Sequence, residues 1–311
     1  MKEEVDLSIV VATYNHEKYI EKALYSILNQ KTSYKYEVWI GDDGSTDNTP
    51  NILRKLQTYF PSNFHFIIRD KNIGVDANFN DLYSKTNGKY LAVLEGDDYW
   101  INLHKIQRQI EFLEKNSEYF ATAHNVVVVD KNDKERNDYK YPECKNIEYT
   151  LSDFKYGILC GQTASIISKN YFKLNDINWF TPSVSWAGDR TRNFMFASYG
   201  KVYCFQEVWS AYRYVTESGS SYSANFKMNE TEEKNYLIYH RELYEFCLRE
   251  VRNDNSIIVA EQMYFQIYLA AVLHKKVYGL SLNQFIKDFI HAKHKMKCLV
   301  FIFKKRRKNG R

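Results

Sequence analysis

Asp97 and Asp98 are the two residues whose types and position most directly suggest chemistry. They follow the apolar segment 90–94 and precede Tyr99 and Trp100. Two adjacent carboxylates repel each other unless a positive charge lies near them. A hard divalent cation is the natural partner, and Mg²⁺ or Mn²⁺ held by carboxylates together with phosphate oxygens fits best. Taken alone, an Asp-Asp pair is better explained as a turn or a helix cap, so its surroundings must decide.

An alternation of strands and helices precedes this pair. Apolar and β-branched runs predict strands over 7–12, 36–41, 64–68 and 90–94. Apolar residues at helical spacing predict helices over 17–29 and 75–85, and a further helix that Thr46 or Asp47 caps. Units of about 30 residues in this order predict an α/β fold with a Rossmann-like, mostly parallel central sheet flanked by helices.

Polar residues follow three of these four strands. Ligands of such sheets bind outside the carboxyl ends of the strands. The first strand leads into Thr13-Tyr14-Asn15, the second into Asp42-Asp43-Gly44-Ser45 and the fourth into Glu95-Gly96-Asp97-Asp98. Five carboxylates and several hydroxyls are therefore expected at one edge, which a purely structural sheet does not need.

The rest of the chain changes from mixed to helical character. We expect a helix over 105–113, strands over 126–129, 161–168 and 201–205, and an exposed hairpin or loop over 131–145. Helices are predicted over 236–251, 257–274 and 282–303, followed by a basic tail. The predicted domains are an α/β domain at 1–222 and a helical C-terminal extension at 223–311.

Composition and missing motifs exclude several classes. The 311 residues are 44% hydrophobic and 26% charged, which excludes wholesale disorder, collagen and coiled coil. No Gly-x-Gly-x-x-Gly follows the first strand and no Gly-Lys-Ser/Thr loop exists, which argues against that dinucleotide fingerprint and against P-loop NTPases. The net charge is +5, and the sequence outside the C-terminal tail has no stripe of basic residues. No nucleic-acid partner is therefore expected.

The cysteines and the N-terminal sequence suggest a compartment. Five scattered cysteines without a Cys-x-x-Cys pair form neither a disulfide framework nor a zinc site. Met1-Lys2-Glu3-Glu4 lacks the basic start of a secretory signal, and no uninterrupted run reaches the roughly 18 apolar residues of a membrane span. We therefore expect a cytoplasmic protein in a reducing environment.

Four motifs together resemble a known family. They are Ser8-Ile-Val-Val-Ala-Thr-Tyr-Asn15, Gly41-Asp-Asp-Gly-Ser-Thr-Asp-Asn-Thr49, Asn72-Ile-Gly74 and Glu95-Gly-Asp-Asp-Tyr-Trp100. In order and spacing they resemble the family 2 glycosyltransferases of GT-A fold, over about the first 220 residues. The resemblance implies an inverting enzyme of bacterial cell-surface polysaccharide, capsule or lipopolysaccharide synthesis. It would use a nucleotide-sugar donor, most simply a UDP-sugar, and a glycan or lipid-linked acceptor.

The resemblance also implies roles by position. Residues 1–100 would be the nucleotide-sugar-binding half and 101–222 the acceptor and catalytic half. Asp98 would bind the metal, Mn²⁺ or Mg²⁺, and Asp97 would lie nearer the ribose or sugar. Asp43 would accept from the base and Tyr14 would pack against its ring. The full set implied to bind the nucleotide is Ala12, Thr13, Tyr14, Asn15, Asp42, Asp43, Asn72, Gly74 and Asp97. Asn72 and Gly74 could instead only form a turn before the helix at Val75.

Catalysis by this family requires a base, because an acceptor hydroxyl is a poor nucleophile at neutral pH. Trp186-Ala-Gly-Asp189 occupies the family's place for it, and Asp189 would be the base, although it could also cap its own helix. Trp186 is a candidate for sugar stacking. Arg213, in Tyr212-Arg213, could neutralise phosphate or pair with a core carboxylate.

Three alternatives remain open from the sequence. Lys304–Arg311 could hold the protein on an anionic membrane surface, making it peripheral on the inner face of the plasma membrane, or form a solvated tail. A sugar nucleotidyltransferase would need a Gly-rich, basic loop after the first strand, which Thr13-Tyr14-Asn15-His16 does not supply. A non-catalytic nucleotide- or glycan-binding module would not need the intact carboxylates.

Overall fold

The structure is a computed structural model that describes residues 4–141, 145–184, 188–215, 229–251, 253–273 and 280–309, with side chains up to Phe303. The described residues form two compact units. The first comprises Met1–Tyr149, Ile158–Ile177 and Tyr199–Asn225, and the second Thr150–Gly157, Asn178–Ser198 and Phe226–Arg311. The division differs from the predicted boundary at 222/223, because two segments from the middle of the chain pack with the C-terminal helices.

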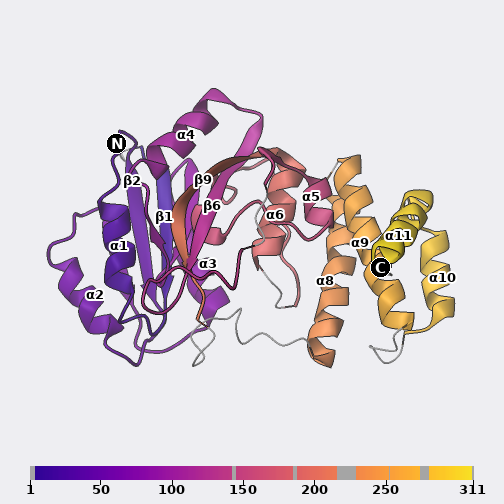
Figure 1. Cartoon of the computed structure of the whole chain (residues 1–311), viewed down its shortest axis with the longest axis horizontal. Helices are drawn as coiled ribbons and strands as arrows, with labels where there is room; N and C mark the ends of the chain where they lie inside the picture. Colours follow the sequence, from indigo (N-terminus) through magenta and orange to yellow (C-terminus); the bar gives the residue numbers. More distant parts are fainter. Residues whose placement is uncertain are drawn as a thin grey trace. The chain divides into compact units, whose positions relative to one another are not determined.

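The first unit is built on one mixed sheet (Figure 1). Its strands are β1 (Leu7–Thr13), β2 (Tyr36–Asp42), β3 (Phe64–Ile68), β4 (Tyr90–Glu95), β5 (Tyr99–Trp100), β6 (Tyr119–Val129), β7 (Glu148–Tyr149), β8 (Ile167–Lys169) and β9 (Lys201–Arg213). They lie in the order β3-β2-β1-β4-β8-β6-β9-β5, with β7 beside β9. β3, β2, β1 and β4 are parallel, and β6 is parallel to β9. The predicted α/β, mostly parallel core is confirmed.

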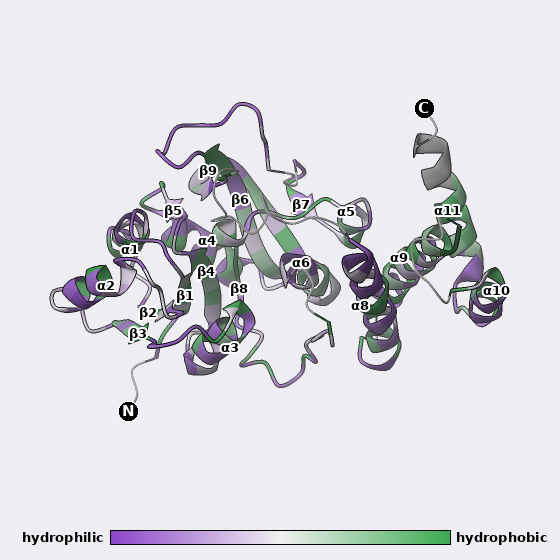
Figure 2. Ribbon diagram, turned by 90° about the horizontal axis from the view of Figure 1, so that it is seen from below, coloured by the Kyte–Doolittle hydropathy of each residue, from purple (hydrophilic) through white to green (hydrophobic). Residues whose placement is uncertain are grey.

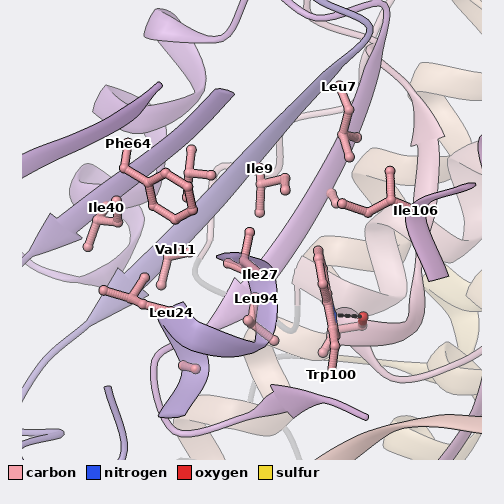
Figure 3. Packing of buried hydrophobic residues seen from close by; sticks show 14 of the residues in the cluster. Leu7, Ile9, Val11, Leu24, Ile27, Ile40, Phe64, Leu94, Trp100 and Ile106 are labelled. Atoms are coloured by element: carbon pink, nitrogen blue, oxygen red, sulfur yellow. Dashed lines mark hydrogen bonds between the residues drawn. The ribbon is translucent and has the colours of Figure 1, made fainter. Parts of the chain in front are cut away.

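Helices cover both faces of the sheet. α1 (Ile20–Leu28), α2 (Thr49–Gln57) and α4 (Lys105–Lys115) lie on one face, and α3 (Val75–Lys85) on the other (Figure 2). Because side chains alternate along a strand, every second residue of β1 points to the same face of the sheet. Leu7, Ile9 and Val11 therefore pack in one apolar cluster with residues of α1, α2 and α4. In that cluster Leu24 and Ile27 pack beside Val11 and Leu94, while Trp100 donates its ring N–H to the carbonyl of Ala164 at 2.9 Å (Figure 3).

The second unit is helical. It contains α5 (Leu151–Lys155), most of α6 (Gly188–Tyr199), α8 (Glu230–Arg249), α9 (Asp254–Leu273), α10 (Leu282–Ile290) and α11 (Lys295–Asn309). Segment 178–198 belongs here because Thr191 and Tyr239 share a hydrogen bond at 3.0 Å and Phe180 packs edge-on against Tyr239.

One helix of this unit has the length and composition of a membrane span. α9 has a mean hydropathy of 1.4 over its most apolar window, although polar residues interrupt its apolar runs. More than half of that window is buried, and α8, α10 and α11 all pack against α9. These properties are those of a core helix of this unit.

Several helices and strands of the structure differ from those predicted from the sequence. The predicted single helix 282–303 is wrong, because the chain turns between α10 and α11. There the buried Glu261 of α9 accepts the backbone N–H groups of Lys293 at 2.6 Å and His294 at 2.9 Å. The predicted strand 161–168 is a short 3₁₀ helix, η1 (Thr163–Ser165), followed by β8, since the side chain of Gln162 accepts from the N–H of Ala164. β9 continues eight residues beyond the predicted end at Phe205.

Candidate functional site

The carboxyl ends of β1, β2 and β4 lie side by side. β1 stands between the other two, with Thr13 opposite Asp42 and Ala12 opposite Glu95. The chain runs from β1 outward to β3 and then returns to β4 on the other side of β1, which is the point at which open α/β sheets bind ligands. The structure therefore brings together the three polar segments that the sequence placed at strand ends.

Three carboxylates form a cluster at this edge. Glu95, Asp97 and Asp98 each offer an oxygen within 4.8 Å of the others. The sequence predicts Glu95 as one of the edge carboxylates but not as a metal ligand. Its position as the last residue of β4, two residues before Asp97, was the signal available in the sequence. Clustered oxygen donors are what Mg²⁺ and Mn²⁺ prefer, so the donor set fits a hard divalent cation.

Asp98 is the fixed member of this cluster. Its side chain is buried, and its two oxygens accept hydrogen bonds from different segments. The backbone N–H of Arg213 donates to Oδ1 at 2.8 Å and the side-chain amide of Gln162 donates to Oδ2 at 2.9 Å. Both partners come from the half of the first unit that follows residue 100, so that half completes a cluster that begins on β4.

Burial raises the pKa of Asp98 well above its usual range, and the negative charges of Asp97 and Glu95 raise the pKa further. The hydrogen bonds from Arg213 and Gln162 oppose this shift without cancelling it. A buried carboxylate beside two others is stabilised in its charged form by a cation. The electrostatics of the cluster thus agree with its donor chemistry.

Arg213 is buried and its guanidinium binds protein groups. It donates to the carbonyl of Asp97 at 2.9 Å, to the carbonyl of Asp130 at 2.5 Å and to the carboxylate of Asp133 at 2.5 Å. It also lies 4.0 Å from the ring centre of Tyr19. Arg213 therefore pairs with the carboxylate of Asp133, whose side chain is 39% exposed and so is not the core carboxylate of the sequence alternative. In this arrangement Arg213 ties the end of β9 to the carboxylate cluster.

Asp43 organises the loop before α3. Its carboxylate accepts the backbone N–H groups of Ile73 at 2.8 Å and Gly74 at 3.1 Å, and Asn72 also accepts from Gly74 at 3.0 Å. Gly74 has φ +93°, which favours glycine, so the turn predicted before α3 is present. Gly44 has φ +68°, and a side chain there would meet the backbone of Lys71 at 2.4 Å. These contacts hold loop 71–74 against the end of β2.

The segment after β1 is held to the segment after β2. Asn15 has φ +56°, and its backbone N–H donates to the hydroxyl oxygen of Ser45 at 2.8 Å. Its side-chain oxygen accepts from the backbone N–H of Thr46 at 2.8 Å. Asp42 is buried and bonded to both the hydroxyl and the N–H of Ser45; burial nevertheless raises its pKa. Asp42 thus has a structural partner at the edge.

Two residues of this segment are differently exposed. Thr13 is buried, and its hydroxyl oxygen has no hydrogen-bond partner. Nδ1 of His16 also lacks a partner, and both atoms face the backbone of Gly96. Tyr14 presents 43% of its surface to solvent. An exposed aromatic ring at a ligand-binding edge can pack against a flat ligand group.

Asp189 lies outside the first unit. Asp189 is the second residue of α6, and its carboxylate accepts the N–H of Arg190 at 2.7 Å, so it does bind the first turn of its own helix. Trp186 lies outside the described residues, as do residues 216–228, which include the Gly/Ser stretch after β9. Their roles stay predictions.

A family model described as glycosyl transferase family 2 matches residues 8–174. An uncharacterized protein of Mycobacterium tuberculosis is 43% identical over 123 residues, which are 40% of this chain and 36% of that protein. The Escherichia coli UDP-Glc:alpha-D-GlcNAc-diphosphoundecaprenol beta-1,3-glucosyltransferase WfaP is 32% identical over 124 residues, or 40% of this chain and 47% of WfaP. The chain thus spans less than half the length of these relatives.

A solved structure shares the fold. The crystal structure of Staphylococcus aureus TarS 1–349 in complex with UDP-GlcNAc matches with a TM-score of 0.64 at 19% identity, covering 85% of this chain and 71% of that chain. At this identity the likeness concerns the fold, which confirms the expected GT-A architecture.

Proposed function

The chain belongs to glycosyl transferase family 2, and we propose that it moves a sugar from a nucleotide donor to a hydroxyl of a glycan or lipid-linked saccharide. The observation that carries this proposal is the cluster of Glu95, Asp97 and Asp98 at the strand edge where β1 meets β4. A carboxylate cluster at this point suits a nucleoside diphosphate bound through a divalent cation.

The donor is proposed to be a UDP-sugar. The relative WfaP is named for UDP-Glc, and the TarS fragment of the same fold was solved with UDP-GlcNAc. The nucleoside would lie over Tyr14 and the loop that Asp43 anchors, while Ala12, Thr13, Asn15 and Asp42 shape the edge beneath it. The name of WfaP, which includes a diphosphoundecaprenol-linked sugar, also supports a lipid-linked saccharide as acceptor. The transfer is proposed to serve cell-surface polysaccharide synthesis.

The cluster would hold Mn²⁺ or Mg²⁺. Asp98 is fixed by Arg213 and Gln162, so Asp97 and Glu95, which are only half-buried, are the carboxylates with more freedom to reach a cation and the donor. When bound, the cation would neutralise the charge of the departing nucleoside diphosphate.

The reaction is proposed to be a single displacement with inversion. The acceptor oxygen forms a bond to the anomeric carbon while the bond from that carbon to the diphosphate oxygen breaks. The proton of the acceptor hydroxyl passes to a carboxylate, for which Asp189 is proposed. Asp189 lies at the start of α6, half-buried, where a carboxylate is also favoured by the helix dipole.

Four cysteines of the described residues, Cys160, Cys204, Cys247 and Cys298, are buried and form no disulfide bond. Cysteines without disulfide bonds suit a reducing compartment, which supports the proposal of a cytoplasmic location.

Thermal melting with UDP, GDP, CDP or ADP, each with Mn²⁺ or with EDTA, tests the donor proposal. A ligand that binds the folded chain raises the melting temperature by mass action, so we expect a rise with UDP that requires Mn²⁺. Asp97→Asn should remove this rise without unfolding the chain. A rise with another nucleotide, or an equal rise in EDTA, would contradict the donor or the metal assignment.

Turnover assays then separate the alternatives. Transfer from a UDP-sugar that Asp189→Asn slows without weakening UDP binding would support the proposed base. If Asp189→Asn lost both sugar transfer and UDP binding, Asp189 would have a structural role. Release of pyrophosphate from a nucleoside triphosphate and a sugar phosphate would identify a nucleotidyltransferase instead. Donor binding without transfer to any of a broad set of acceptors would identify a binding module.

A further inference from the structure

Exposed apolar side chains gather on the last two helices of the second unit. Leu282, Ile286 and Ile290 on α10, and Met296, Val300 and Phe303 on α11, are each between 45% and 68% exposed. Within the described residues, no other stretch of 22 residues exposes as many large apolar side chains. These six residues are called the apolar rows.

The spacing of the apolar rows places each on one face of its helix. Residues three or four positions apart lie above one another on a helix, and the rows follow this spacing. Another side of each helix is packed within the unit: Phe285 of α10 and Cys298 and Ile302 of α11 are buried in a cluster with residues of α9. Both helices are therefore apolar on the side that packs against α9 and also on a side that faces outward. Figure 2 shows apolar, green segments on both of them.

Basic residues surround the apolar rows. Lys287, Lys293, Lys295 and Lys297 are exposed on and between the two helices. Residues 282–311 contain ten lysines and arginines and one aspartate. The chain has 43 basic and 38 acidic residues, so residues 1–281 contain 33 basic and 37 acidic residues. The positive charge of the protein therefore resides in this terminal region, and the remainder is slightly acidic.

We propose that the apolar rows, with the lysines around them, bind the surface of an anionic lipid bilayer. Exposed apolar side chains can enter the boundary between headgroups and acyl chains, while the exposed lysines meet the negative headgroups. The side chains of Lys304–Arg311, which the sequence offered as a membrane-binding tail, lie outside the described residues. A second copy of this chain fits the surface less well, because a symmetric contact would place the same basic residues against each other. The proposal goes beyond the transferase activity and does not depend on it.

Co-sedimentation of the full chain with lipid vesicles tests the proposal. The chain should bind vesicles of phosphatidylglycerol and phosphatidylcholine and stay in solution with phosphatidylcholine alone. Added salt should weaken the binding, since it screens the lysines. The double variant Ile290→Ser/Phe303→Ser should bind the anionic vesicles about tenfold more weakly, because it removes two of the most exposed apolar side chains.

Leu248→Ser is the matched control. Leu248 is also an exposed apolar residue of the same unit, on α8 and outside the apolar rows, so its loss should leave vesicle binding unchanged. Circular dichroism melting should show that all variants remain folded. Equal binding of the double variant and the wild type would overturn the proposal, as would an absence of binding to anionic vesicles at low salt. A wild-type dimer that the double variant dissociates would assign the rows to a second copy instead. None of these outcomes requires a nucleotide, so a failure here is distinguishable from a failure of the proposed transfer.

Discussion

The backbone N–H of Arg213 donates to the carboxylate of Asp98 at 2.8 Å, across 115 positions of the chain. The guanidinium of the same Arg213 donates to the carbonyl of Asp97 at 2.9 Å. One residue at the end of β9 therefore holds the carboxylate of Asp98 and the backbone of Asp97, and leaves the carboxylate of Asp97 free to move. Arg213 can act on the reaction as a positioning residue, by holding the geometry of the carboxylate cluster, while its own donors stay on protein groups.

Gln162 should matter for cation affinity as well as for stability. Gln162→Met removes the hydrogen bond to Asp98, and bonds to charged groups contribute about 1.5–3 kcal/mol. We expect a lower melting temperature and an affinity for Mn²⁺ about tenfold weaker, because Asp98 loses one of its two orienting partners. Isothermal titration with Mn²⁺ and thermal melting measure the two effects.

Gln109→Met is the control for Gln162→Met. Gln109 is equally buried, and it donates to the carbonyl of Ser165 at 2.9 Å without contacting the carboxylates. It should lower the melting temperature but leave the affinity for Mn²⁺ intact. If both variants weakened Mn²⁺ binding alike, a general loss of stability would explain the effect of Gln162→Met.

The stability of the chain should depend on pH through Asp98. The pKa of Asp98 is raised by burial and by Asp97 and Glu95 from an ordinary value of 3.8. Its protonated form is therefore favoured by folding: its contribution to stability is full below pH 3.8 and is lost as the pH rises through the folded-state pKa. Melting in EDTA should show wild type losing stability over this window relative to Asp98→Asn, in which the group does not titrate.

Divalent cation should reverse this trend. The cation binds the ionised carboxylates, so the rise in melting temperature that Mn²⁺ causes should grow with pH through the same window. Parallel pH profiles of wild type and Asp98→Asn would show that Asp98 is not the titrating group. A Mn²⁺ effect independent of pH would place the cation elsewhere.

Gly44→Ala should disturb nucleotide binding more than Gly74→Ala. Both glycines have positive φ, and a side chain at such positions costs on the order of 1–3 kcal/mol. At Gly44 the new atom would also lie 2.4 Å from the backbone of Lys71 and displace loop 71–74 from Asp43, whereas at Gly74 it meets nothing within 4 Å. Fluorescence titration with UDP should show the larger loss of affinity for Gly44→Ala. Equal losses would mean that backbone strain alone decides.

Glu261→Gln should destabilise the helical unit. Glu261 is fully buried and accepts from two backbone N–H groups and from the hydroxyl of Tyr244, at 2.7 Å. An amide would turn a donor toward one of these N–H groups, so we expect a loss of about 2–4 kcal/mol in the free energy of unfolding. Urea unfolding followed by circular dichroism measures it.

Glu245→Gln provides the comparison for Glu261→Gln. Glu245 is an exposed residue of α8, paired with Arg241 at 3.9 Å, and its substitution should change stability by less than about 0.5 kcal/mol. If Glu261→Gln were equally mild, the turn between α10 and α11 would not depend on the buried carboxylate.

The sequence by itself determined the elements whose signals are local. α3 begins and ends at the predicted residues, and β1, β2, β3 and β4 lie within one residue of their predicted bounds, because apolar periodicity and turn residues are read over a few neighbouring positions. The order of these elements was enough to place Thr13, Asp42 and Glu95 at one edge, since parallel strands end on the same side. The family motifs are also local, which is why the resemblance could be stated from the sequence.

Only the tertiary structure decided which distant groups meet. Gln162 and Arg213 reach Asp98 from 64 and 115 positions away, and no spacing rule encodes such a contact. The two-residue strands β5 and β7 exist because they pair with β9, so their own sequences carried no signal. Similarly, Glu261 of α9 fixes the turn that divides α10 from α11, where helical spacing alone predicted one helix. In each case a hydrogen bond between remote segments outweighs the local preference of the chain.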